Sequence, residues 1–556
     1  MSLIQALLLA LAYAFARSSF NFGLGNYVLS QPLVAGLFAG VLLGDPARGA
    51  ALGGALNLIT LGISQLRIRI GPDVALVGYV GVPLLLLSGL QADAPGAALI
   101  FTALIALGTL LTFASGFVNT ILTHWSDLFA ETGEIGVVSG IAILPSQVWL
   151  FISSFLPVLL LLRVDTALLF QIAESIPPWL QIALVACQQL LAALGIALSL
   201  NLIMRGSSIA YLLLGWLASL AIGPLPATIL GGSIAAIHAY LARRRQPVRD
   251  AVPGATRTPG VIDALIPDVM PSDDSEDDIE SPQSLSIMQL TSSFILWAFF
   301  HNVAYNFERF QNLGFALALA PIGRRLWGTV EERADFLRRH LTLFNTEWVL
   351  GSYIVGASAA LEERKANGDA MNNSEFAGAK VSFMASLDVL GNALMSGLVI
   401  ALAVAIGAQI AKQNGALGGV LFLVMGSTAV IGIALFAYQL GYRQVRHWAT
   451  WARLNDWLRA GLFGALRLGT FVLGALIVPY AGVHLPIGAT IRIGDATIAL
   501  SALINGLGTH ILPLGLVLWL WWWLRYRRIN PLTLLFICVA VAFVACWLFG
   551  RLGWLG

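Results

Sequence analysis

Long stretches without a charged residue constrain this chain more than any other feature of its sequence. A helix needs about 20 residues to cross the hydrocarbon of a bilayer. Stretches that meet or approach this length are 74–92, 97–123, 135–162, 176–204, 206–242, 395–411, 413–442, 470–491, 496–524 and 529–550. A soluble core made from them would need polar helix faces, which are missing, and only 11% of all residues are charged. The sequence therefore predicts an all-α, polytopic protein of the lipid bilayer.

The N-terminus and the cysteines agree with this class. Residues 1–16 are apolar, follow no basic region and precede Arg17, so we interpret them as a retained first helix rather than a cleaved leader. Cys187, Cys538 and Cys546 lie in apolar stretches without C-x-x-C spacing. We interpret them as small hydrophobic residues of the core or the lipid-facing surface.

No motif of an enzyme or a cofactor site is recognisable. The histidines are dispersed and lack the spacing of metal ligands. No Walker loop, nucleophile elbow or dinucleotide fingerprint stands in a convincing context, and the net charge of +2 argues against a nucleic-acid binder. We therefore expect no catalytic residue, no metal and no cofactor, and we expect any phosphate chemistry to come from a partner protein.

Residues 243–285 differ in composition from the rest of the chain. They open with three arginines, 243–245, and run through proline-rich sequence to the acidic residues of 272–278. Such a segment cannot bury apolar surface, so we expect a disordered linker between membrane units at 1–242 and 286–556. Arginines next to a hydrophobic stretch stay on the cytoplasmic side, which places the linker in the cytoplasm.

The second unit opens with a charged region, residues 323–375, that has a helical pattern. This pattern predicts amphipathic helices at a cytoplasmic interface. The apolar stretch 348–361 inside it is expected to form a hydrophobic hairpin that dips toward the protein interior. A solvated loop is an equally good interpretation of the charged ends.

Both units contain apolar regions interrupted by glycine. In the first unit Gly36, Gly40 and Gly44 recur at every fourth residue, a spacing that lets helices approach closely in lipid. The second unit has a less regular series from Gly391 to Gly419. Interrupted segments in both halves indicate the midplane binding site of a transporter, with plain helix packing as the alternative.

Polar residues follow the glycine series of the first unit. Polar groups in hydrocarbon need partners, so they are candidate functional residues. Asn57 and Gln65 are neutral amides suited to the hydroxyl groups of a sugar. Asp73 is a further candidate, although an ion pair with Arg67 or Arg69 would also explain it.

The second unit carries a polar and aromatic segment between His301 and Asn312. Aromatic faces stack on sugar rings, and Asn306, Glu308 and Arg309 can bind sugar hydroxyls; an amphipathic helix lying on the membrane would have a similar composition. Further polar candidates in apolar surroundings are Asn345 and Asn392.

Ordered motifs in both units resemble one family. The first unit has Gln31-Pro32-Leu33-Val34-Ala35-Gly36, Val41-Leu42-Leu43-Gly44-Asp45, Leu61-Gly62 and Pro72-Asp73. The second has Asn306-Phe307-Glu308-Arg309, Leu313-Gly314-Phe315, Arg338-Arg339-His340-Leu341, Phe344-Asn345-Thr346, Ala360-Leu361-Glu362-Glu363, Lys380-Val381 and Asn530-Pro531-Leu532. The chain resembles enzyme IIC fused to enzyme IID of a mannose-type phosphotransferase system.

The resemblance implies an architecture and a set of partners. It implies two inverted-repeat helical units, each with a mobile core and a fixed scaffold, that work as an elevator-like transporter in the bacterial cytoplasmic (inner) membrane. It further implies a homotrimer of IIC–IID pairs, a sugar substrate bound between the cores, and separate cytoplasmic IIA and IIB proteins. In the family IIB phosphorylates the arriving sugar and IIA recharges IIB.

Two departures from the family pattern concern the expected sugar site. Enzyme IIC usually carries a glutamate where this chain has Asn57, and enzyme IID usually reads Gly-Asp-Pro where this chain reads Gly391-Asn392-Ala393. An amide both donates and accepts hydrogen bonds but carries no charge. The loss of charge-assisted hydrogen bonds would cost about 1–3 kcal/mol each, enough to change the preferred sugar.

Three functions remain open at this point. The leading hypothesis is a sugar-translocating component that moves a hexose or a related sugar inward for phosphorylation by IIB. The alternatives are a divergent membrane receptor or scaffold of the same fold and an uncoupled sugar facilitator.

Overall fold

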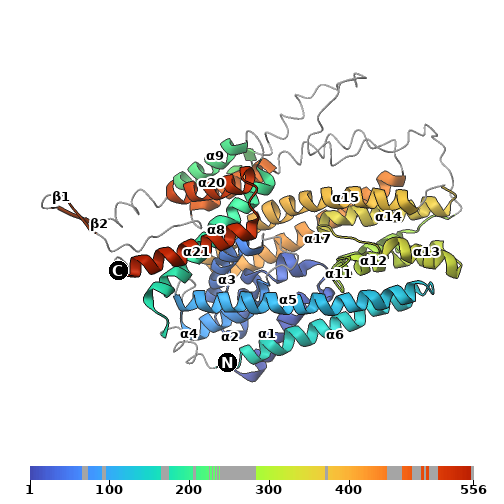
Figure 1. Cartoon of the computed structure of the whole chain (residues 1–556), viewed down its shortest axis with the longest axis horizontal. Helices are drawn as coiled ribbons and strands as arrows, with labels where there is room; N and C mark the ends of the chain where they lie inside the picture. The colour runs from blue at the N-terminus through green and yellow to red at the C-terminus, as the bar shows by residue number, and fades with distance from the viewer. Residues whose placement is uncertain are drawn as a thin grey trace, which may run out of the picture.

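The computed structural model describes residues 1–64, 73–90, 95–164, 175–204, 208–224, 226–227, 230–231, 233–234, 237, 283–369, 373–446, 466–478, 490–493, 496–499 and 511–551. Almost all of these residues are helical. We call the described residues up to 237 the first unit and those from 283 onward the second unit. Figure 1 shows the long helices of both units lying side by side.

The elements of the first unit are α1 (Leu3–Arg17), η1 (Ser19–Asn21), η2 (Gly25–Leu29), α2 (Pro32–Leu43), α3 (Pro46–Ser64), η3 (Val77–Gly81), α4 (Val82–Ser88), α5 (Pro95–Ala130), α6 (Ile135–Leu161), α8 (Pro178–Ile203) and α9 (Ile209–Ile222). Those of the second unit are α11 (Ile287–Phe300), α12 (Asn312–Leu326), α13 (Val330–His340), α14 (Trp348–Ala366), α15 (Asn373–Leu394), η5 (Met395–Ile400), α16 (Ala401–Asn414), α17 (Ala416–Arg446), β1 (Thr490–Ile493), β2 (Ala496–Ala499), α20 (Ile511–Tyr526) and α21 (Pro531–Arg551).

The described residues contain helices that can cross a bilayer. Six are long and apolar enough, at Ala97–Ala130, Ile135–Leu161, Pro178–Asn201, Leu390–Asn414, Ala416–Arg446 and Thr533–Arg551. This confirms a multi-pass membrane protein. The apolar N-terminal residues form helix α1, whose side chains pack into the core of the first unit.

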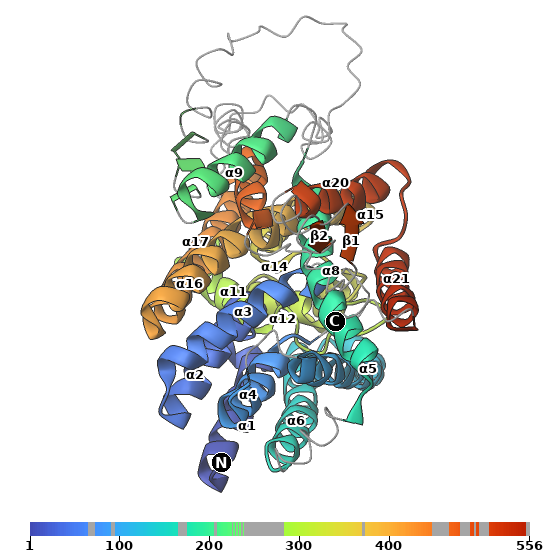
Figure 2. The ribbon, with the colours of Figure 1, turned by 90° about the vertical axis from the view of Figure 1, so that its left-hand side faces the viewer.

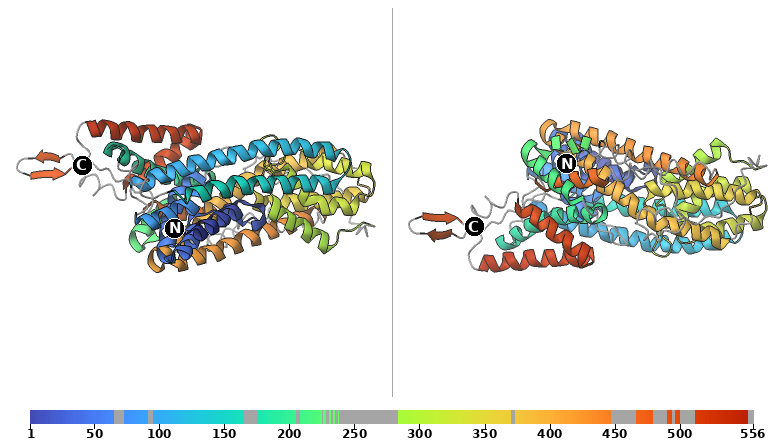
Figure 3. Two further views of the ribbon diagram at one scale, coloured as in Figure 1. Left: turned by 90° about the horizontal axis from the view of Figure 1, so that it is seen from below. Right: turned by 90° about the horizontal axis from the view of Figure 1, so that it is seen from above.

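The described residues are almost all helical, as predicted, with an exception between residues 490 and 499. The antiparallel strands β1 and β2 form a hairpin there, which projects beyond the helices in Figure 3. The strands are rich in Thr and Ile, and the dipeptide Gly494-Asp495 separates them. Both features favour a hairpin with a two-residue turn, and a prediction based on hydropathy alone does not take them into account.

The predicted close approach of glycine-bearing helices is confirmed. A Cβ added at Gly36 of α2 would lie 2.4 Å from the carbonyl oxygen of Gly49 on α3. In the second unit, a Cβ at Gly418 of α17 would lie 2.2 Å from the carbonyl oxygen of Gly407 on α16. Each unit therefore contains a helical hairpin whose two backbones nearly touch.

The two glycine-packed hairpins also contact each other. An added Cβ at Gly54 of α3 would lie 3.2 Å from Ala408 of α16, and one at Gly415 would lie 2.6 Å from Ala47. Figure 2, an end view, shows α2 and α3 beside α16 and α17. One hydrophobic core includes residues of both units, so the units pack as one body.

The charged region of the second unit is helical, as predicted, but the expected hairpin at 348–361 is wrong. These residues lie in one continuous helix, α14, which Glu347 caps through the backbone N–H groups of Val349 and Leu350. Gly351 and Gly356 lie within this helix and do not form a turn. The missing side chain lets Thr346 pack against Gly351 and the Tyr438 carbonyl oxygen approach Gly356.

A buried ion-pair network joins α13 to the C-terminal part of α14. Glu362 accepts hydrogen bonds from Arg339 at 3.0 and 3.1 Å and from Trp327 at 2.9 Å, and it lies 2.9 Å from His340. Asn367, at the end of α14, exchanges hydrogen bonds with the backbone of Gln283. The predicted linker therefore returns to the second unit at this end of the molecule, which we call the linker side.

Candidate functional site

A polar seam runs along α15. The extended segment Leu341–Glu347 lies against a face of α15 whose members, four residues apart, are Lys380, Met384, Asp388 and Asn392. Lys380 donates a hydrogen bond to Thr342, and Met384 interacts with Asn345 and Thr346. We call the four residues of this face, together with Thr342, Asn345, Thr346 and Glu347 of the extended segment, the α15 seam.

The inner end of the seam reaches the first unit through Glu347. This carboxyl group is 5% exposed and accepts a hydrogen bond of 2.9 Å from the hydroxyl of Tyr27 in η2. It also accepts the N–H groups of Val349 and Leu350 at 2.8 and 2.9 Å, as the N-cap of α14. One side chain therefore both caps a helix and joins the two units.

Gly391 brings α15 against that carboxyl group. A Cβ added at Gly391 would lie 2.5 Å from Oε2 of Glu347, so a larger residue would push the helix away. The next residue, Asn392, donates to the carbonyl oxygen and to Oδ1 of Asp388 at 2.6 and 2.9 Å. Asp388 and Asn392 are half-buried, and the amide oxygen of Asn392 faces no donor that we identify among the described residues.

Asn57 caps a helix at the contact between the units. It is fully buried and accepts the N–H of Leu33, in the first turn of α2, at 3.1 Å. Its amide donates to Gln31 at 2.9 Å, and Gln31 donates to the carbonyl oxygen of Asn26, the residue before Tyr27. Asn57 and the seam are thus linked through one short chain of polar groups.

Asp73 forms a buried ion pair, as the alternative interpretation predicted, but its partner is Arg17 of α1. The hydroxyl of Tyr13 also donates to Asp73, and the N–H of Ala75 donates to Oδ1 at 3.0 Å. Asp73 therefore fixes α1 to the start of the η3–α4 segment. Gln65, Arg67 and Arg69 lie outside the described residues.

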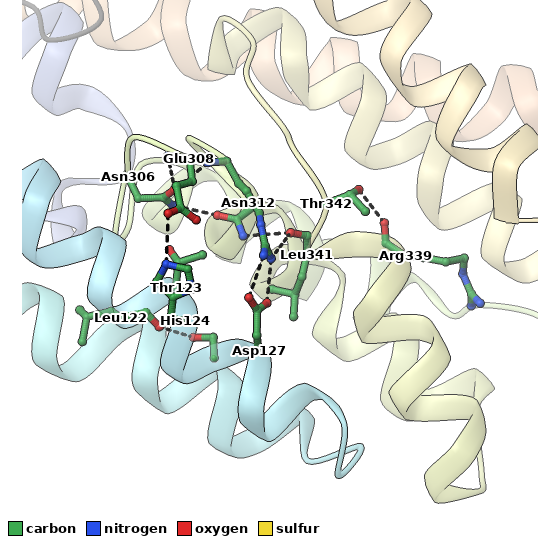
Figure 4. A network of polar contacts seen from close by, with 12 residues as sticks. Leu122, Thr123, His124, Asp127, Asn306, Glu308, Asn312, Arg339, Leu341 and Thr342 are labelled. Atoms are coloured by element: carbon green, nitrogen blue, oxygen red, sulfur yellow. Dashed lines mark hydrogen bonds and ion pairs between the residues drawn. The ribbon is translucent and has the colours of Figure 1, made fainter.

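Asn306, Glu308 and Arg309 lie in a loop that docks on α5 of the first unit. Asn306 is fully buried and uses its amide within the loop: it donates to Asn312 at 2.9 Å and accepts the N–H of Arg309 at 2.8 Å. Figure 4 shows this network above α5. The hydrogen-bonding groups of Asn306 that could bind a sugar therefore stabilise the loop instead.

The charged residues of this loop pair with α5. Arg309 binds Asp127 through two hydrogen bonds of 2.7 and 2.8 Å, and Glu308 lies 3.1 Å from Nε2 of His124 (Figure 4). Further contacts are those of Phe307 with Gly116 and Phe113, of Asn119 with the Tyr305 carbonyl oxygen, and of Thr120 with the Phe307 N–H. We call this contact the α5 joint.

The candidate site residues that the sequence predicted thus lie in separate parts of the structure. Asn345 and Asn392 lie along the α15 seam, Asn57 is linked to it, and the loop residues belong to the α5 joint. Sequence reasoning did not identify Tyr27 or Glu347 as candidate site residues. Neither stands in a recognisable motif, and their partnership spans 320 residues of sequence.

Comparisons with known proteins cover both units. Residues 3–240 match the family model described as the sorbose-specific IIC component of the PTS (phosphotransferase) system. Residues 284–550 match the one described as the mannose/fructose/sorbose family IID component. The mannose-specific EIID component of Escherichia coli K12 is 32% identical over 289 residues, which are 49% of this chain and 99% of that protein. The chain belongs to the mannose/fructose/sorbose family of the phosphotransferase system.

Two further similarities concern one curated protein and one solved structure. The mannose-specific EIIC component of Escherichia coli K12 is 25% identical over 205 residues, which are 35% of this chain and 73% of that protein. A solved structure described as the mannose transporter ManYZ in complex with microcin E492 is 28% identical, covers 49% of this chain and 99% of its own, and has a TM-score of 0.29. The matches of residues 3–240 to a IIC model and of residues 284–550 to a IID model show that this chain joins both components in one polypeptide.

Proposed function

We propose that the chain is the sugar-translocating IIC–IID component of a phosphotransferase system, and that the sugar binds where the α15 seam meets the first unit. Its family relatives are sugar permease components. The observation that carries the site is the Tyr27–Glu347 hydrogen bond between the units, beside half-buried Asp388 and Asn392. Polar groups at membrane depth that keep some exposure are suited to a polyhydroxylated ligand.

The sugar contacts follow from the hydrogen-bonding capacity left at this place. The Asn392 amide donates to Asp388 but keeps its oxygen for a hydroxyl donor. Asn57 supports the site from behind by fixing the start of α2. A direct contact of Asn306, Glu308, Arg309 or Asp73 with the sugar stays a prediction, since these side chains already have protein partners.

The wider setting is proposed from the family. The chain moves a hexose or a related sugar across the bacterial inner membrane, a separate IIB protein phosphorylates it, and a IIA protein recharges IIB. Residues 243–285 are the cytoplasmic linker, which keeps the IIC and IID units in a fixed ratio. The elevator-like movement of inverted-repeat cores and the homotrimer are further parts of this proposal.

Uptake by proteoliposomes loaded with IIA, IIB and a phosphoryl donor tests this function. We expect phosphorylated sugar to accumulate, and we expect Asn392→Ala to weaken sugar binding about tenfold, as the loss of one buried hydrogen bond predicts. Asn530→Ala, which removes an exposed amide before α21, is the control. Equal affinity in Asn392→Ala and wild type would remove the site from the proposal.

The same assay separates the alternatives. Sugar that equilibrates without phosphorylation would identify a facilitator. Failure of every IIB and every hexose tested, together with a protein that co-purifies with the chain, would identify a receptor or scaffold.

A further inference from the structure

Lys380 is a buried cation at the outer end of the α15 seam. It is 3% exposed, and no carboxylate pairs with it among the described residues. Its ammonium group donates to the hydroxyl of Thr342 and, at 3.3 Å, to the carbonyl oxygen of Arg339, and it lies 5.3 Å from the ring centre of Phe315. A buried ammonium group without a counter-ion is costly unless something else stabilises it.

The nearest acidic cluster is already committed elsewhere. Both oxygens of Glu362 are occupied by donors from Arg339, Trp327 and His340. Asp335 pairs with the other side of the Arg339 guanidinium group at 2.6 Å. Burial lowers the pKa of Lys380 to about 8, a shift that a bound anion would oppose.

Lys380 is separated from the surface of the protein by Thr342. Thr342 is exposed and hydrogen-bonds to the same Arg339 carbonyl oxygen (Figure 4). Asp388 and Asn392 lie 8 and 12 residues farther along α15, which corresponds to about 12 and 18 Å at the rise of an α-helix. The seam thus leads from the proposed sugar site to a cation beside an exposed hydroxyl.

We propose that Lys380 and Thr342 form a binding site for the phosphoryl group of a phosphorylated sugar that leaves along the α15 seam. A lysine ammonium donates charge-assisted hydrogen bonds to phosphate oxygens, and the Thr342 hydroxyl donates a neutral one once it turns away from the Arg339 carbonyl oxygen. The inference rests on the proposed function, because that function supplies the sugar phosphate. It differs from a purely structural role, in which Lys380 only caps the last turn of α13 through the Arg339 carbonyl oxygen.

Binding measurements on the purified full-length chain test this site. Inorganic phosphate and mannose 6-phosphate serve as probes in calorimetry, with free mannose measured in parallel. We expect wild type to bind both phosphate probes, and Lys380→Gln to weaken them at least tenfold without weakening free mannose. Lys412→Gln, which removes an exposed lysine from the last turn of α16, should leave phosphate affinity unchanged.

A second variant covers the case in which Lys380→Gln loses its fold, as its melting temperature would show. Thr342→Val keeps the lysine and removes only the exposed hydroxyl, and we expect a three- to tenfold loss of phosphate affinity. No phosphate binding by wild type, or unchanged affinity in the folded variants, would overturn the inference. Those results leave the uptake assay untouched, so the phosphate site and the transport function fail independently.

Discussion

At the residue scale, buried polar side chains join parts of the molecule that are far apart in the sequence. Tyr27 and Glu347 connect the two units, and Arg17 and Asp73 connect α1 to η3. The sequence showed that Asp73 needs a partner in an apolar environment. It could not show which arginine that is, because Arg17 lies 56 residues away while Arg67 and Arg69 stand close by.

The Tyr27 hydroxyl is expected to stabilise the contact between the units. Tyr27→Phe leaves the ring but removes the donor to a buried carboxyl group, which costs about 1–3 kcal/mol when the acceptor stays unsatisfied. We expect a lower melting temperature in detergent and slower sugar uptake. Tyr526→Phe, whose side chain is 66% exposed, is the control. A Tyr27→Phe protein as stable and active as wild type would argue against this role.

Glu362 gives a test that depends on pH. Burial alone would raise the pKa of Glu362, but the hydrogen bond from His340 and the charge of Arg339 lower it to about 2. The folded pKa therefore lies below the unfolded value of about 4.3. The stabilisation is complete above that unfolded value and is lost as pH falls toward the folded one.

Glu362→Gln should accordingly destabilise the protein most at neutral pH. Because Arg339 stays buried without its partner, we expect a loss of about 3–5 kcal/mol. The difference from wild type should stay constant between pH 7 and about pH 5 and shrink below it. Melting temperatures over this range measure the effect, and Glu331→Gln on the exposed side of α13 serves as control. A difference that grows on acidification would contradict the ion-pair network.

At the scale of helices and strands, sequence predicts best where a local pattern suffices. The glycine series at Gly36, Gly40 and Gly44 predicted close helix contact, and α2 and α3 meet at Gly36 and Gly40, while Gly44 ends α2 with a positive φ of 86°. The stretch 348–361 was predicted to turn back on itself, but its glycines serve packing against α17 and Thr346 instead. Only the partner helix decides between these uses of glycine, and the sequence does not identify that partner.

Two glycines of α17 allow a matched test of hairpin packing. A Cβ at Gly418 would lie 2.2 Å from the Gly407 carbonyl oxygen, whereas one at Gly432 would meet nothing within 4 Å. Gly418→Ala should lower the melting temperature, because α16 and α17 must separate. Gly432→Ala should keep or slightly raise it, since alanine favours a helix. Equal effects of both substitutions would mean that this contact adds no stability.

At the scale of the whole molecule, the contacts between the units include two of opposite character. The α5 joint combines the Arg309–Asp127 ion pair with the insertion of Phe307 against Gly116, where an added Cβ would lie 2.5 Å from the phenylalanine ring. The seam contact, between Tyr27 and Glu347, is polar. We infer that the joint is the fixed contact between the units, while the seam is where a transported molecule separates them.

If the joint and the glycine-packed hairpins carry the assembly, the covalent linker is dispensable for it. Residues 1–242 and 243–556, produced together as two chains, should co-purify and transport sugar, because the units share one hydrophobic core. The loss of the tether affects only their effective concentration.

Phe307→Ala in the second chain should reduce co-purification at least several-fold, since it empties a packed aromatic position. Phe436→Ala, on the exposed side of α17, should not. Two chains that fail to associate even without substitution would show that the linker, rather than the joint, holds the halves together.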